Sequence, residues 1–85
     1  MSQNDDLQQD EVTAAVVEVI QAAGAVAPLH PDTDIYAAGI TSMMLLGILL
    51  DLEDRFQVTI REQEFLVLRT AQGLASMIVN LRQAH

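Results

Sequence analysis

The apolar residues near the start of the chain recur at every third or fourth position. Between Asp5 and Ala23 they are Val12, Val16, Val19, Ile20 and Ala23. This spacing is typical of the buried face of an amphipathic helix. Acidic residues crowd the beginning of the segment, where the helix dipole favours negative charge. The pattern therefore predicts a first helix over residues 5–23, preceded by disordered residues 1–4.

The helical period stops at Gly24, and Pro28 and Pro31 prevent it from resuming soon afterwards. Residues 24–40 are therefore predicted to form a long connection. A loop of this length in a small domain is usually functional or is packed by its own side chains. We expect Ile35 and Tyr36 to anchor this loop.

A second helix is predicted over residues 41–56, with either Thr41 or Ser42 capping its free backbone N–H groups. Its apolar residues fall on two stripes. The stripe expected to face the core contains Leu45, Ile48, Leu49, Leu52 and Phe56. The second stripe contains Met43, Leu46 and Leu50. A helix with one buried face does not need a second apolar stripe, so we expect this stripe to face a partner.

The pattern of residues 57–85 predicts an extended connector and two further helices. Residues 57–61 form the connector, and residues 62–66 form a short helix that carries Phe65 into the core. Thr70 is placed to cap a last helix over residues 71–83. The inward positions of that helix are Leu74, Met77, Ile78 and Leu81. The predicted fold is all-α, a single domain over residues 1–85 built as a small four-helix bundle with three longer helices and one short one.

Composition narrows the classes of function. The chain has no cysteine, which excludes disulfides, thiolate metal sites and a cysteine nucleophile. It has 12 carboxylate side chains but only four arginines and no lysine, which gives a net charge of −8. This charge argues against binding to nucleic acid or to an anionic membrane and favours basic protein partners. The first residues of the sequence are polar and acidic, unlike a signal peptide. No apolar run approaches the ~20 residues that a membrane-spanning helix needs. We therefore expect a cytoplasmic protein.

Candidate catalytic and metal-binding groups are few. His30 and His85 are the only histidines. A triad of Ser42, His30 and Asp32 or Asp34 can be written, but the sequence around Ser42 is not a hydrolase elbow and no oxyanion-hole segment accompanies it. A calcium loop that starts at Asp32 lacks the required Gly at its sixth position and Glu at its twelfth. A lone histidine beside a proline is more often an ordinary loop residue than a metal ligand.

The position of Ser42 in the sequence allows two interpretations. It follows a turn at Gly39 and begins a predicted helix, where backbone N–H groups and the dipole favour an attached phosphate. On position alone, the simpler interpretation is favoured, namely that Ser42 acts only as a helix cap. Gly47, in the middle of the same helix, costs about 1 kcal/mol relative to alanine and leaves room for a close approach to the backbone.

The stretch from Asp34 to Val58 resembles the centre of an acyl or peptidyl carrier protein. The matching residues are Asp34, Tyr36, Gly39, Ile40, Ser42, Met43, Leu46, Leu52, Glu53, Asp54 and Phe56. Residues 58–60 are similar to the family's connector, and residues 69–78 to its last helix. The resemblance covers roughly residues 12–81 and is most specific over residues 34–56.

This resemblance implies that Ser42 receives a 4′-phosphopantetheine arm from coenzyme A through a magnesium-dependent transferase. The thiol of the arm would hold an acyl, aminoacyl or peptidyl cargo as a thioester. The chain would then be a monomeric carrier rather than an enzyme, and its partners would be the transferase, a loading ligase and downstream biosynthetic enzymes. The resemblance implies a partner-binding face made of Thr41, Met43, Leu46, Gly47, Leu50, Glu53 and Asp54.

Three positions depart from the family pattern. Thr41 stands where aspartate is commonest, and Met44 and Gly47 stand where fatty-acid carriers usually have acidic residues. The second helix is therefore hydrophobic rather than acidic, which favours dedicated partners that dock through apolar contacts. The sequence of residues 34–42 is most similar to that of free-standing carriers of aminoacyl or specialised acyl groups. The alternative is a non-catalytic helical interaction module, a dimer or adaptor that uses the apolar face of this helix.

Overall fold

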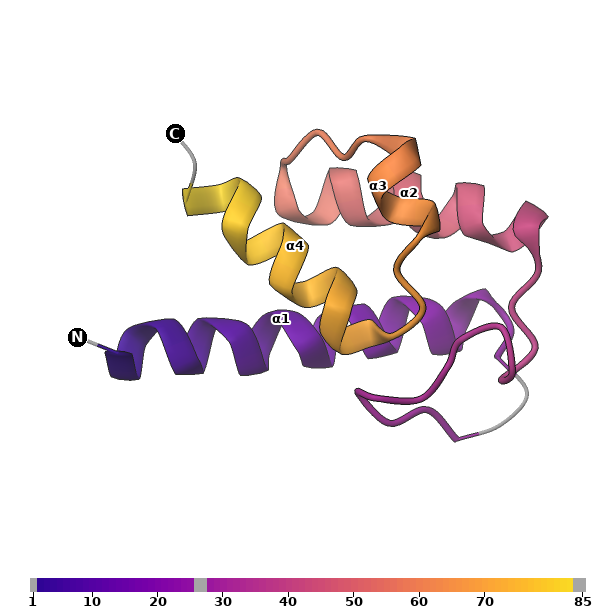
Figure 1. Ribbon diagram of the computed structural model, residues 1–85, viewed down its shortest axis with the longest axis horizontal. Helices are drawn as coiled ribbons and strands as arrows, with labels where there is room; N and C mark the ends of the chain where they lie inside the picture. The colour runs from indigo at the N-terminus through magenta and orange to yellow at the C-terminus, as the bar shows by residue number, and fades with distance from the viewer. Residues whose placement is uncertain (1, 26–27, 84–85) are drawn as a thin grey trace.

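The computed structural model describes residues 2–25 and 28–83, and these form four helices joined by loops. The helices are α1 (Ser2–Ala23), α2 (Ser42–Phe56), α3 (Glu62–Leu66) and α4 (Ala71–Gln83) (Figure 1). The described residues contain no strand. The prediction of an all-α bundle with three longer helices and one short helix is therefore confirmed. No helix among the described residues is long and apolar enough to cross a membrane.

The first helix is longer than its apolar face. The sequence predicts a start at Asp5 and disorder over residues 1–4, whereas α1 begins at Ser2, so this boundary is corrected. Residue 1 lies outside the described residues. Once a helix has nucleated, each further residue adds one backbone hydrogen bond for each residue that becomes ordered. The helix therefore continues over residues 2–4, which are polar, and hydrophobic periodicity cannot locate that end.

The core is built from aliphatic side chains of α1, α2 and α4, with one aromatic ring from α3. α1 packs mainly along α4 and, over a shorter length, against α2 (Figure 1). The predicted inward residues of α1 are buried, apart from the half-buried Ala23. Phe65 reaches the core as predicted and is 1% exposed. The buried residues of α4 are Ala71, Leu74, Ala75, Ile78 and Val79, with Met77 and Leu81 partly buried beside them.

The long loop between α1 and α2 contributes its own side chains to the core. Ile35 is completely buried, as are Ala38 and Ile40 apart from a few per cent of their surface. The backbone N–H of Ile35 donates to the carbonyl of Arg69 at 2.8 Å, and the N–H of Gln72 donates to the carbonyl of Pro31 at 2.9 Å. These bonds hold the loop against the start of α4. Ile35 is therefore one of the two anchors that the sequence predicts, and the other, Tyr36, is partly buried against the core.

The connection from α2 to α4 contains α3, and the end of α2 and the start of α4 are both capped. Gln57 ends α2 in the left-handed conformation with φ 55°, and Ile60 from the following connector is buried. The hydroxyl of Thr70 accepts a 3.0 Å hydrogen bond from the N–H of Gly73. Thr70 therefore caps α4, as its place in the sequence predicts.

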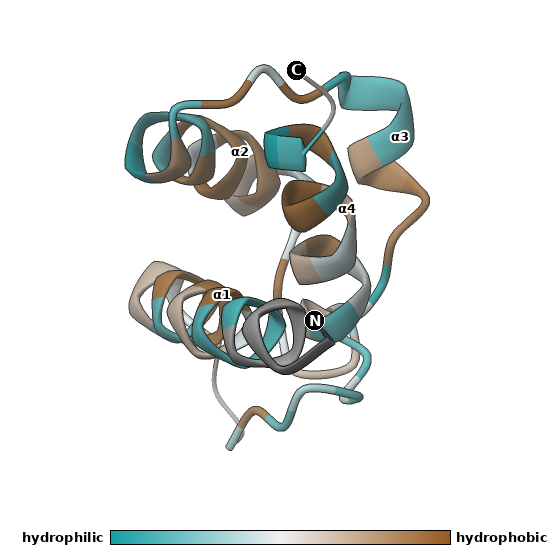
Figure 2. Cartoon of the chain, turned by 90° about the vertical axis from the view of Figure 1, so that its left-hand side faces the viewer, coloured by the Kyte–Doolittle hydropathy of each residue, from teal (hydrophilic) through white to brown (hydrophobic). Residues whose placement is uncertain are grey.

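The apolar residues of α2 divide between the core and the surface. Leu45, Ile48, Leu49 and Leu52 are buried, and Phe56 is half-buried. The second stripe is exposed, with Met43 at 85%, Leu46 at 53% and Leu50 at 65%. Figure 2 shows hydrophobic residues over much of α2. α2 is therefore not buried all round, and its second stripe forms an apolar surface.

We expect Ile35→Ala to lower the free energy of unfolding by about 2–5 kcal/mol, because it removes a completely buried side chain and leaves a cavity. Leu50→Ala removes an exposed side chain and should change the same quantity by less than about 0.5 kcal/mol. Urea unfolding followed by circular dichroism measures both. Equal losses in the two variants would mean that Leu50 belongs to the core and would contradict this division.

Candidate functional site

The site lies where the long loop enters α2. Gly39 has φ +102°, a conformation that residues with a side chain rarely adopt. Its N–H donates to the carbonyl of Tyr36 at 3.1 Å, and the N–H of Ile40 donates to the carbonyl of Ile35 at 3.1 Å. Because Ile40 is buried, the turn is fixed to the core on its way into the helix. The loop thus presents the first residues of α2 in a defined position.

Thr41, not Ser42, caps α2. The Thr41 hydroxyl accepts a 3.3 Å hydrogen bond from the N–H of Met44, and the N–H of Thr41 donates to the Met44 sulfur at 3.2 Å. This reciprocal pair is a capping box with methionine in the place usually taken by glutamate or glutamine. The predicted helix start at residue 41 is corrected by one position, since Thr41 has extended backbone angles and α2 begins at Ser42.

Capping by Thr41 leaves the Ser42 side chain without a structural task. Ser42 is exposed at the first position of α2, and its hydroxyl makes no hydrogen bond within the described part of the chain. The backbone N–H groups of Ser42 and Met43 also lack a partner among the described residues. Unpaired N–H groups and the positive end of the helix dipole favour an anion at this place. A phosphodiester on the Ser42 oxygen therefore fits the residues that surround it.

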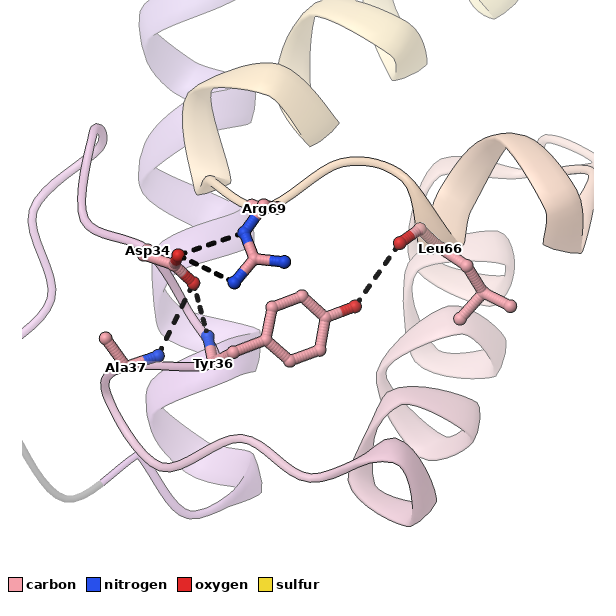
Figure 3. A network of polar contacts seen from close by, with 5 residues as sticks. All are labelled: Asp34, Tyr36, Ala37, Leu66 and Arg69. Carbon is pink, nitrogen blue, oxygen red and sulfur yellow. Dashed lines mark hydrogen bonds and ion pairs between the residues drawn. The ribbon is translucent and has the colours of Figure 1, made fainter.

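A polar network braces the loop ahead of Ser42 (Figure 3). One carboxylate oxygen of Asp34 accepts from the N–H groups of Tyr36 and Ala37, at 2.9 and 3.4 Å. The other oxygen accepts from Nε of Arg69 and pairs with its Nη2, both at 2.9 Å. The guanidinium of Arg69 lies 4.6 Å from the centre of the Tyr36 ring, and the Tyr36 hydroxyl donates to the carbonyl of Leu66 at 3.4 Å. One arginine thus ties the loop to the segment between α3 and α4.

The network also sets the protonation of Asp34. Partial desolvation raises the pKa of this carboxyl group, but the hydrogen bonds from Arg69, Tyr36 and Ala37 and the positive charge of Arg69 lower it. Together the lowering contributions prevail, so the pKa of Asp34 lies below its ordinary value. Asp34 is therefore ionised at neutral pH and holds its partners. The sequence indicates Asp34 but not Arg69, which is 35 residues away with no local signal joining the two.

Two grooves flank the start of α2. One, of about 330 Å³, lies between α2 and α3, and its lining includes Ser42, Leu46 and Phe65. The other, of about 340 Å³, lies between α1 and α2, and its lining includes Val19, Gly47 and Ile48. Met43 lines both grooves. Ser42 is therefore next to the residue that separates two concave surfaces.

The residues of the predicted partner-binding face differ in their surroundings. Met43, Leu46, Gly47, Leu50 and Asp54 are all exposed on α2. Thr41 is exposed as well, although its hydroxyl is used for capping. Glu53 is half-buried, and its carboxylate accepts a 2.8 Å hydrogen bond from the N–H of Ile60. Glu53 therefore holds the connector after α2, a task that the sequence does not indicate.

The alternative chemistries gain no support from the described residues. His30 and Asp32 are exposed on the loop, and no hydrogen bond connects either residue to Ser42 in the described chain. His85 lies outside the described residues. Within residues 2–25 and 28–83, no group of three or more histidine, aspartate or glutamate side chains could hold a metal ion. Glu62 is a titratable residue that lines the same groove as Ser42, but no hydrogen bond joins the two within the described residues.

Comparison with models of protein families matches residues 10–78 to the family described as "Phosphopantetheine attachment site". The match spans α2, α3 and nearly all of the packed parts of α1 and α4. No curated protein matches the chain.

The bracing network makes a prediction about the titration of Asp34. Arg69→Gln should raise the pKa of Asp34 towards its ordinary value, because the variant removes the positive charge and the ion pair. The stability that ionised Asp34 contributes is present above its unfolded-state pKa and is lost as pH falls through the lower folded-state pKa. The side-chain carboxyl carbon shift, followed by NMR against pH, measures this pKa.

Arg61→Gln is the matched control, because Arg61 pairs with Glu64 rather than with Asp34. It should leave the Asp34 titration where it is in the parent chain. If Arg69→Gln also leaves the titration unchanged, the ion pair does not form in solution.

Proposed function

The chain belongs to the phosphopantetheine-attachment family, and on this premise we propose that Ser42 is the residue that bears the arm. Domains of this family carry covalent 4′-phosphopantetheine, and the chain is a carrier of groups linked through it. The arm supplies a thiol that holds an acyl or aminoacyl group as a thioester. The chain contains no cysteine, so that thiol would be the only one it has.

The observation that supports this assignment is the division of roles between two neighbouring hydroxyl groups. Thr41 and Ser42 are both exposed, but the Thr41 oxygen is occupied by the N–H of Met44. The Ser42 oxygen has no partner in the described chain and lies beside the two unpaired N–H groups of Ser42 and Met43. Of these two described hydroxyl groups, the one of Ser42 therefore combines a free nucleophilic oxygen with a place for the phosphate.

Attachment requires one bond exchange at the Ser42 oxygen. The hydroxyl proton passes to a base of the transferase, and the oxygen bonds to the phosphorus of coenzyme A that bears the pantetheine. Adenosine 3′,5′-bisphosphate leaves with the electron pair of the broken phosphorus–oxygen bond. Glu62 lines the groove next to Ser42 but makes no hydrogen bond to it within the described residues, so we assign the base to the transferase and treat the chain as its substrate.

We assign partner recognition to the exposed apolar surface of α2. Met43, Leu46 and Leu50 follow Ser42 along the helix and are each more than half exposed. Leu66 and Val67, from α3 and the residue after it, are 46% and 74% exposed. A transferase, a loading ligase and later biosynthetic enzymes would all dock here to reach the arm. The low number of charges on this surface suits cargo-specific partners that dock through apolar contacts.

The same apolar surface supports one alternative function. Exposed apolar patches of this kind also mark interfaces between copies of one chain. In that case the protein would be a helical adaptor that dimerises through Leu46 and its neighbours, and Ser42 would have no chemical role. The two functions differ in what Ser42→Ala and Leu46→Asp would do.

We expect the chain to gain the mass of one phosphopantetheine when it is incubated with coenzyme A, Mg²⁺ and a broad-specificity phosphopantetheinyl transferase. Ser42→Ala should stay unmodified, because it removes the free oxygen. Intact-mass spectrometry measures both results. Ser76→Ala, which changes a half-buried serine on α4, is the matched control and should be modified like the parent chain. Modification of Ser42→Ala, or none of the parent chain, would contradict the proposal.

We also expect the parent chain to sediment as a monomer at all concentrations tested by analytical ultracentrifugation. Leu46→Asp should leave the sedimentation unchanged, because the surface is used with partners and not with a second copy. It should nevertheless slow the transfer of phosphopantetheine. A dimer that forms with rising concentration and is lost in Leu46→Asp would instead support the adaptor.

A further inference from the structure

The side chain of Met44 contacts both ends of the loop that leads to Ser42. Its sulfur accepts a 3.2 Å hydrogen bond from the N–H of Thr41, the last residue before α2. Its methyl carbon lies beside Gly24, the first residue after α1, because a Cβ built on that glycine would be only 2.5 Å from the methyl carbon. One side chain therefore joins the end of α1 to the start of α2.

Gly24 makes room for this contact. Its φ of +127° and the 3.2 Å hydrogen bond from its N–H to the carbonyl of Gln21 are typical of a glycine that ends a helix. The missing Cβ also leaves the space that the Met44 methyl group occupies. Met44 is half-buried and packs against the core. Contacts on both sides of the sulfur therefore restrict a side chain that is otherwise flexible.

This restriction matters because a thioether sulfur is a weak acceptor. Glutamate or glutamine usually takes this position of a capping box. Here the N–H of Met44 also donates to the Thr41 hydroxyl at 3.3 Å, so two hydrogen bonds close residues 41–44 into one turn. The packing of the methyl group beside Gly24 holds the sulfur where the Thr41 N–H can reach it.

Ser42 is the second residue of this closed turn. Its hydroxyl makes no hydrogen bond within the described part of the chain, so no contact of its own side chain fixes it. The direction in which the Ser42 side chain leaves the helix therefore depends on the backbone of residues 41–44. The two hydrogen bonds between Thr41 and Met44 hold that backbone.

We propose that Met44 is a positioning residue for the attachment of phosphopantetheine to Ser42. This inference rests on the proposed function and adds a residue that acts through Thr41. Met44 keeps the first turn of α2 closed, and the closed turn holds the Ser42 oxygen in line with the phosphorus of coenzyme A on the transferase. A displacement of about 1 Å can cost on the order of a hundredfold in rate, so a small change in this turn affects the bond exchange.

Two substitutions separate the hydrogen bond of Met44 from its packing. Met44→Leu keeps an apolar side chain of similar volume but has no acceptor. Met44→Gln has a carbonyl oxygen that can accept from the Thr41 N–H, as in an ordinary capping box, but is less apolar. If Met44 acted only by packing, leucine would be the better replacement. If it acts through the capping box, glutamine is the better one.

The test is the kinetics of phosphopantetheine transfer from coenzyme A to the full chain by a broad-specificity transferase. We expect Met44→Leu to lower kcat about three- to tenfold, because the reacting oxygen is less well placed. Its KM for the chain should stay within about twofold of the parent value, since the exposed residues of α2 are unchanged. Met44→Gln should keep kcat within about twofold of the parent. Met77→Leu, the same exchange at a half-buried methionine of α4, is the matched control and should change neither constant.

Hydrogen exchange of the Thr41 amide, followed by NMR, measures the bond without the transferase. The exchange should be faster in Met44→Leu, which lacks the acceptor, and close to the parent rate in Met44→Gln. Thermal unfolding shows whether each variant is folded at the temperature of the kinetics. If Met44→Leu does not fold, Met44→Gln carries the test, and a tenfold loss of kcat in folded Met44→Gln contradicts the inference.

Two further results would overturn the inference. One is modification of folded Met44→Leu with the kcat of the parent chain. The other is a larger loss of kcat in Met44→Gln than in Met44→Leu, which would show that Met44 acts by packing alone. In either case the parent chain would still be modified at Ser42, so the proposed function would stand. Failure of the parent chain to be modified at all would instead remove the proposed function and this inference with it.

Discussion

Burial of the α1–α2 loop is the constraint on which the position of Ser42 depends. A chain of 85 residues without cysteine has little core to spare, and small domains bury a smaller fraction of their surface than large ones. The loop therefore supplies Ile35, Ala38 and Ile40 to the core, and the ion pair of Asp34 with Arg69 ties it to the segment between α3 and α4. A loop held in this way delivers Ser42 to one place without enclosing it.

At the start of α2, Thr41 stabilises the helix, and the neighbouring Ser42 is left available for the role that we propose. Thr41 completes the helix, a task worth about 0.5–2 kcal/mol when such a cap is replaced by alanine, and so frees the Ser42 hydroxyl. The same separation continues along the helix, where Leu45, Ile48 and Leu52 hold the core while Met43, Leu46 and Leu50 stay exposed. Little of the exposed side contributes to folding. That side is therefore available to the partners that we propose for the arm on Ser42.

Local patterns in the sequence predict most of the fold and part of the site. The buried faces of α1 and α2, the burial of Phe65 and the Thr70 cap follow from periodicity and capping preferences. The choice of Thr41 over Ser42 as cap does not, because both residues can cap and the sequence does not show which of them has the extended backbone of a cap. The sequence also does not predict that Arg69 bonds to Asp34 or that Ile60 bonds to Glu53. These contacts depend on how distant or extended segments fold back. The extra turn of α1 carries no apolar signal.

The central claim is that the oxygen of Ser42, and not that of its neighbour, carries the arm. Tandem mass spectrometry of the peptide that contains both hydroxyl groups, taken from the modified full chain, tests this directly. The account predicts that fragment ions place the phosphopantetheine on Ser42 and leave Thr41 unmodified, because the Thr41 oxygen is engaged with the N–H of Met44. Fragments that place the group on Thr41, or on any other residue, would contradict it.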